Sequence, residues 1–207
     1  MPIATLIAPD RAQSGVISDA CDRLSEAGCA PAEIEWLDAG KAVDIGFDGS
    51  ISAARNALRP LETEYDIAVQ PSEGRRKMLL VSDMDSTMIT VECIDELADY
   101  AGIKPEIAAI TEQAMAGELD FAEALKARVA LLAGLSEDVI AQCLSERVRP
   151  MAGAETLVRT MTTWGAHGVL VSGGFTSFAG PVADIIGLAD VHANVLEIKD
   201  GKLTGAL

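Results

Sequence analysis

Residues 77–92 read KMLLVSDMDSTMITVE. The apolar run MLLV stops at Ser82, and two aspartates, Asp83 and Asp85, follow one residue apart before the hydroxyl pair Ser86-Thr87. This pattern is typical of a parallel β-strand that is buried in a sheet and ends in a loop of carboxylates. We therefore expect an α/β domain whose parallel sheet contains this strand.

The two carboxylates suggest phosphoryl chemistry. Acids this close repel each other unless a cation lies between them, and oxygen ligands suit Mg²⁺, which also holds substrate phosphate. One acid can then accept a phosphoryl group as an aspartyl-phosphate, while the other acts as general acid and base. The alternative is an ordinary turn with solvated acids. The short pattern DxD leaves both interpretations open.

The longer string is more specific. An apolar strand that leads into DxDST, followed by Glu92 and the helix-like ECIDELADYAG, resembles the phosphoserine phosphatases of the haloacid dehalogenase (HAD) superfamily. The resemblance extends from about Lys77 to the end of the chain. It implies a HAD-like Rossmannoid parallel sheet with a helical cap. It also implies Mg²⁺-dependent hydrolysis of O-phosphoserine to serine and phosphate, the last step of serine biosynthesis. Asp83 would be the nucleophile and Asp85 the acid and base, and both would hold the metal.

Composition excludes several classes of protein. The 207 residues carry a net charge of −16, and the pI is near 4.4, whereas a nucleic-acid-binding protein needs a basic face. No apolar run approaches the ~20 residues of a membrane span. The first residues, MPIATLIAPDR, lack a basic leader and a cleavage site, and the four cysteines lack CxxC spacing. We therefore expect a cytoplasmic protein that acts on a small molecule.

The first 74 residues have their own pattern. Strands are expected at 3–8, 32–37, 42–47 and 65–69, and helices at 14–27 and 51–61. The order βαββαβ is the ferredoxin-like unit, and bacterial phosphoserine phosphatases often carry a similar, ACT-like domain at the amino terminus. Its role would be regulatory, structural or dimerising, the last giving a homodimer. Pro71 and Gly74 lie in a polar segment, so we predict domains at 1–74 and 75–207.

Helical spacing continues for about fifty residues after the DxDST motif. Helices are expected at 92–101, 105–116, 121–133 and 137–147, and together they would form a cap over the active site at about 92–150. Arg128 shares an apolar helix face with Phe121 and Leu125. A guanidinium there needs a carboxylate or phosphate partner, unless it extends from the edge of the face to water.

The resemblance gives these residues roles. Residues 126–129, KARV, match a KxRV pattern whose arginine binds the substrate carboxylate, so Arg128 would do so here. Glu92 would bind the substrate ammonium group, and Met115 and Phe121 would line the pocket. From position alone, Glu92 is only an acid in the first turn of a helix.

A second loop follows the next strand. The run GVLV at 168–171 leads into Ser172, Gly173 and Gly174, where a hydroxyl and close backbone amides can bind phosphate. The alternative is an ordinary strand-to-helix turn. The resemblance makes this the second motif of the family, with Ser172 on a phosphoryl oxygen. Further elements are expected as helices at 153–164 and 181–186, a strand at 190–196 and a hairpin at 198–203.

Relatives carry two further motifs beyond this point, a lysine and a GDGxND-type loop, and neither occurs before Leu207. We therefore expect the sequence to belong to a larger phosphatase, with an apolar strand edge uncovered and the catalytic site incomplete in these residues alone. Two alternatives stay open: an amino-acid-sensing or catalytically dead binding protein, and a HAD phosphatase for another small monoester.

Overall fold

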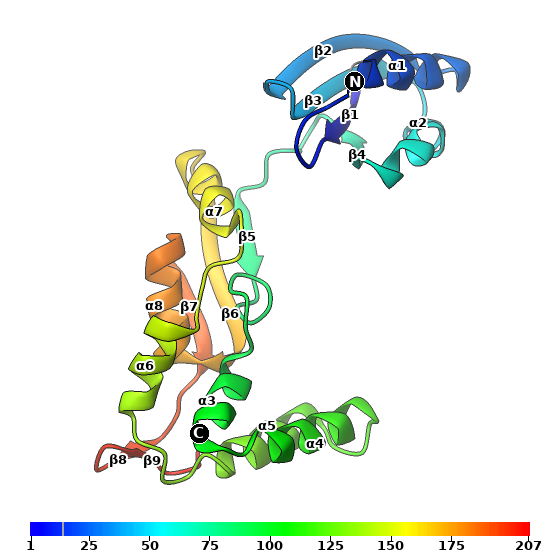
Figure 1. Cartoon of the computed structure of the whole chain (residues 1–207). Helices are drawn as coiled ribbons and strands as arrows, with labels where there is room; N and C mark the ends of the chain where they lie inside the picture. The colour runs from blue at the N-terminus through cyan, green and yellow to red at the C-terminus, as the bar shows by residue number, and fades with distance from the viewer. Residues whose placement is uncertain (14) are drawn as a thin grey trace. The chain divides into compact units, whose positions relative to one another are not determined.

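The computed structural model describes residues 1–13 and 15–207. The chain divides into two compact units, Met1–Arg76 and Lys77–Leu207 (Figure 1). In the described residues, no helix has both the length and the apolar character that a membrane crossing requires.

The first unit confirms the predicted βαββαβ order. Its elements are β1 (Pro2–Ile7), α1 (Val16–Glu26), β2 (Ala30–Asp38), β3 (Ala42–Asp48), α2 (Ile51–Leu58), the 3₁₀ helix η1 (Arg59–Thr63) and β4 (Asp66–Pro71). The sheet order is β2-β3-β1-β4 with antiparallel neighbours. The helix predicted to reach Leu61 ends at Leu58, and the 3₁₀ turn that follows contains Pro60, which has no backbone N–H to donate. The predicted start of the first helix, Ser14, lies outside the described residues.

The second unit is an α/β fold with a parallel sheet, as predicted. Its elements are β5 (Leu79–Ser82), α3 (Cys93–Ala101), α4 (Lys104–Met115), α5 (Phe121–Ala130), α6 (Asp138–Glu146), α7 (Ala154–Thr163), β6 (His167–Phe175), α8 (Thr176–Ile186), β7 (Asp190–Asn194), β8 (Ile198–Lys199) and β9 (Lys202–Leu203). The sheet order is β5-β6-β7, with both pairs parallel. The β8–β9 hairpin turns at Asp200 and Gly201, which both have positive φ, as a type I′ turn requires.

One prediction about this unit is wrong and another is only partly confirmed. The strand before the aspartates is not fully buried: β5 lies at the sheet edge, in agreement with the expected uncovered apolar edge, and Leu79 and Val81 are 57% and 59% exposed. Its apolar side chains identify a strand, but they do not show which neighbours cover it. The helix predicted to start at Pro181 begins at Thr176 instead. A proline inside a helix costs about 3 kcal/mol, but the helix packs Phe178 and Val182 into the core, which favours its continuation.

Helices α3 to α6 form an insertion between β5 and α7, with α4 and α5 side by side (Figure 1). The two connections to this insertion are hydrogen-bonded to each other. Thr90 N donates to Arg149 O at 3.0 Å, and Met151 N donates to Met88 O at 2.8 Å. The insertion therefore leaves and rejoins the sheet domain at one place, close to the loop that carries the aspartates.

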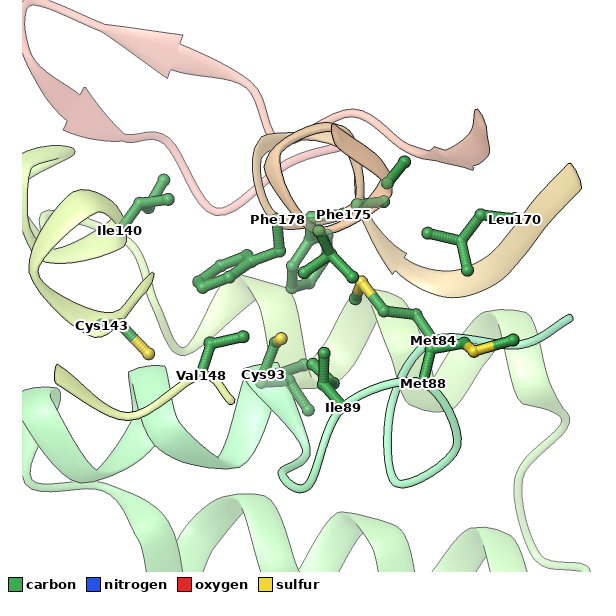
Figure 2. Packing of buried hydrophobic residues seen from close by; sticks show 14 of the residues in the cluster. Met84, Met88, Ile89, Cys93, Ile140, Cys143, Val148, Leu170, Phe175 and Phe178 are labelled. Atoms are coloured by element: carbon green, nitrogen blue, oxygen red, sulfur yellow. The ribbon is translucent and has the colours of Figure 1, made fainter. Parts of the chain in front are cut away.

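A buried cluster anchors that loop. Met84 and Ile89 belong to the loop, and Cys93 is the first residue of α3. Their side chains lie against Phe175, just before α8, and Phe178, within α8 (Figure 2). All five side chains are fully buried. Because a close-packed interior is hardly compressible, this core restricts the positions that Asp83 and Asp85 can take.

Candidate active site

A pocket of about 280 Å³ opens where β5 and β6 end. The carboxyl ends of parallel strands meet at one sheet edge, so the loops after both strands line it, together with α5 of the insertion. The lining residues are Asp83, Asp85, Glu92, Ile94, Phe121, Leu125, Arg128, Gly173, Gly174 and Phe175.

Asp85 is held by the start of α3. Its Oδ1 accepts a hydrogen bond from Cys93 N at 2.9 Å. Burial raises the pKa of Asp85 above its ordinary value, the hydrogen bonds from Cys93 lower it, and the nearby carboxylates of Glu92 and Asp83 raise it again. The net effect is upward, which suits a general acid. Burial also raises the pKa of the Cys93 thiol, so this thiol stays protonated at neutral pH.

Glu92 is oriented by a serine of the DxDST motif. Ser86 Oγ donates to Glu92 Oε1 at 2.6 Å. Ser86 has a φ of 50°, a left-handed conformation that is uncommon for serine, and such local strain is often found at functional sites. Sequence reasoning noted Ser86 in the motif but gave it no role. Together with Asp83 and Asp85, Glu92 gives the pocket three carboxylates.

Arg128 supplies the positive charge of the pocket. Its Nε donates to Ala124 O at 3.3 Å, one turn earlier on α5. Across residues 1–13 and 15–207, no acidic side chain forms an ion pair with it. The helix is fixed at its start by a capping box between Asp120 and Glu123. A fixed, unpaired guanidinium in a pocket is suited to a carboxylate or phosphate ligand.

The second loop comes very close to both the aspartate loop and α5. A Cβ atom at Gly174 would lie 2.8 Å from Asp85 Oδ2, and one at Gly173 would lie 2.9 Å from Phe121 Cζ. Gly174 therefore needs glycine in the present arrangement, whereas at Gly173 the exposed Phe121 ring could move aside. Ser172 is nearly buried, and its Oγ accepts a hydrogen bond from Gly174 N at 2.9 Å.

Most of the predicted site residues thus lie together, with two differences. Met115 is 85% exposed and lines a neighbouring hollow of about 300 Å³, which shares Phe121 and Arg128 with the pocket. Ser172 does not line the pocket, but its Oγ accepts a hydrogen bond from the N–H of Gly174, which does. Sequence reasoning missed Ile94 and Phe175 as lining residues. Apolar residues at these positions predict core packing, so nothing in the sequence marks them as lining a pocket.

The pocket has the donor types of a magnesium site. In the described part of the chain, no three His, Cys, Asp or Glu side chains are grouped to hold a metal ion. Mg²⁺ needs fewer protein ligands, because it commonly binds one or two carboxylates and completes its octahedron with water and substrate phosphate. Asp83 and Asp85 are oxygen donors of that kind, so the residues fit the ion.

A parallel sheet with two acids after one strand, a glycine loop after the next and a helical insertion over both is an α/β domain with its candidate site at the carboxyl ends of the strands. The chain belongs to the haloacid dehalogenase-like hydrolase family, whose model matches residues 80–207.

The chain is similar to several phosphoserine phosphatases. It is 48% identical over 155 residues to that of Polaromonas sp. strain JS666, covering 72% of this chain and 66% of the relative. It is 47% identical over 180 residues to phosphoserine phosphatase SerB2 of Mycobacterium tuberculosis, covering 86% of this chain and 44% of the relative. The chain spans about half to two thirds of the length of such relatives.

Solved structures agree in fold. A probable phosphoserine phosphatase from Vibrio cholerae aligns over 99% of this chain and 62% of its own, with a TM-score of 0.77 and 31% identity. A phosphoserine phosphatase solved as a phospho-aspartyl intermediate analogue aligns over 63% of this chain and 62% of its own, with a TM-score of 0.58 and 38% identity.

Proposed function

We propose that this chain carries the substrate pocket and the nucleophile of a Mg²⁺-dependent phosphatase that converts O-phosphoserine to serine and phosphate. The observation that carries the proposal is the presence of Asp83, Asp85, Glu92 and Arg128 in one pocket. A phosphorylated zwitterion needs an anchor of each sign beside its reacting phosphate, and these residues supply them. The names of the relatives point to the same substrate.

Each anchor has a proposed partner. Arg128 pairs with the substrate carboxylate, and Glu92, oriented by Ser86, pairs with the ammonium group. Ser172, Gly173 and Gly174 bind the phosphoryl oxygens through the hydroxyl and backbone amides. Met115 and Phe121 form apolar walls beside Arg128.

Two carboxylates carry the reaction. Asp83 attacks phosphorus, the bond from phosphorus to the serine oxygen breaks, and Asp85 gives that oxygen a proton. Asp85 then takes a proton from water, which attacks phosphorus and releases Asp83 and phosphate. The Asp83 carboxylate and the Asp85 main-chain oxygen would hold Mg²⁺, which would offset charge on the phosphoryl oxygens.

The proposal extends to the organisation of the chain. Residues 75–207 form the phosphatase domain with a cap at about 92–150, and residues 1–74 form an ACT-like domain that senses a small molecule or pairs two copies. Four free thiols are typical of a reducing compartment, and this favours a cytoplasmic location.

The test is to locate the phosphoryl group. The 207-residue chain and a version extended at its C-terminus with the family's lysine and GDGxND-type motifs are each incubated with Mg²⁺ and ³²P-labelled O-phosphoserine, quenched and digested to locate the labelled peptide. We expect label on Asp83, none in Asp83→Asn, and unchanged labelling in Asp95→Asn, an acid of α3 outside the pocket. Label on another side chain would overturn the proposal. Tight binding without any labelling would favour the binding-protein alternative.

A further inference from the structure

The pairing of β6 with β7 is interrupted beside the pocket. Val171 pairs with His192, but the next pair is Phe175 with Asn194. Three residues of β6, Ser172 to Gly174, therefore face a single residue of β7. Such a bulge takes backbone groups out of the regular ladder and leaves them in need of other partners.

The side chain of Asn194 provides a partner for two of these groups. Its Nδ2 donates to Gly173 O at 2.9 Å and to Gly174 O at 3.3 Å. Asn194 is the last residue of β7 and is half-buried. Its amide thus takes the place of strand pairing at the point where the backbone leaves the sheet.

This contact sets the direction of the loop amides. The peptide unit is planar and trans, so its C=O and N–H point in opposite directions. Because Asn194 holds Gly173 O towards β7, the N–H of Gly174 points away from β7. Gly174 N donates a hydrogen bond to Ser172 Oγ at 2.9 Å. Two adjacent glycines have great conformational freedom, so without such a restraint their amides would adopt many directions.

We propose that Asn194 is a positioning residue that holds the Ser172-Gly173-Gly174 loop in its phosphate-binding form. The inference rests on the proposed function, in which this loop binds the phosphoryl group. Asn194 itself would touch neither the phosphate nor the nucleophile. It would act by fixing the loop before the substrate arrives, because fixed donors bind a developing charge better than mobile ones.

Two variants test the role. Asn194→Ala removes the amide, whereas Asn194→Asp keeps its shape but places an acceptor against two carbonyl oxygens. His192→Ala is the matched control, since His192 is exposed and lies two residues earlier on the same face of β7. The first measurement is the ¹⁵N backbone order parameter. At Gly173 and Gly174 we expect about 0.85 in the wild type and below about 0.6 in both variants, with no change in the control.

The second measurement is calorimetric binding of inorganic phosphate and of L-serine to the 207-residue chain. Loss of these hydrogen bonds should weaken phosphate binding by about 5- to 30-fold. L-serine has no phosphoryl group, so its affinity should be unchanged. A residue with only a structural role would reduce the affinity for both ligands together.

The outcomes separate the inference from the proposed function. Unchanged order parameters in both Asn194 variants would overturn the inference even if the wild type binds phosphate. Equal loss of phosphate and serine binding would overturn it as well. If the wild type binds no phosphate, the proposed function fails, and the order parameters alone decide whether Asn194 holds the loop.

Discussion

Gly174→Ala tests how tightly the candidate site is packed. The added Cβ would lie 2.8 Å from Asp85 Oδ2 and 3.1 Å from both Met84 Cε and Ser172 Oγ. The first distance is shorter than folded proteins tolerate, so the Asp85 carboxylate must move. Its other oxygen accepts the hydrogen bond from Cys93 N, and this bond must lengthen or break.

The size of the effect follows from that bond. A hydrogen bond to a charged group contributes about 1.5–3 kcal/mol. If Asp85 is the general acid and base, its displacement should lower kcat for O-phosphoserine by about 10- to 150-fold. Gly180→Ala, in α8 and outside the pocket, is the matched control. Its Cβ would meet no atom within 4 Å, so we expect less than about a twofold change.

Two assays are needed. Phosphate release from O-phosphoserine gives kcat for both variants, and urea unfolding confirms that both are folded. Hydrogen exchange at the Cys93 amide reports the bond to Asp85 without any need for turnover, and it should become faster in Gly174→Ala only. Equal losses of kcat in the two variants, with equal protection of the Cys93 amide, would refute the argument from the Asp85 contact.

Three further predictions concern charge, pH and the core. Arg128→Ala should weaken O-phosphoserine binding by about 10- to 150-fold but leave phosphoethanolamine, which lacks the carboxylate, nearly unchanged in calorimetry; equal losses would contradict the assigned role. The pKa of Asp85 is raised by folding, so its contribution to stability is present below pH 3.8 and is lost as pH rises through the folded value. Asp85→Asn should therefore make the urea midpoint depend less on pH in this range and should raise the midpoint at pH 7. A lower midpoint at pH 7 would argue against a raised pKa of Asp85. Phe178→Ala should cost about 3–5 kcal/mol in urea unfolding, and Leu157→Ala, at a 47% exposed position, less than about 1 kcal/mol; similar costs would contradict the packing seen in Figure 2.

The sequence predicted the local elements and the fold class well, because these depend on short-range patterns. The order βαββαβ, the parallel pair of strands and the run of helices after the first strand all follow from the spacing of apolar residues. The local pattern of β5 predicted burial, whereas its uncovered edge was expected from the resemblance to the family. The run MLLV identifies a strand, whereas the exposure of Leu79 and Val81 depends on which elements lie beside it in space. Pro181 shows the same limit, since packing of α8 outweighs the local signal.

The same distinction between short-range patterns and long-range contacts applies to the site residues. Asp83, Asp85 and Arg128 could be found because a motif or a helix face marks them. Asn194 could not, because its contacts with Gly173 and Gly174 span about twenty residues and arise from a shift in strand register. No pattern near position 194 distinguishes an asparagine that restrains a loop from one that ends a strand.

The charge of the pocket explains why a cation belongs to the proposed mechanism. With every group ionised, Asp83, Asp85 and Glu92 outweigh Arg128 by two negative charges, and the chain as a whole carries −16. A phosphate dianion would be repelled by such a pocket. The oxygen donors of Asp83 and Asp85 fit Mg²⁺, and a divalent cation held there would offset the two excess negative charges. The proposed mechanism therefore needs the cation before the pocket can accept a phosphate dianion.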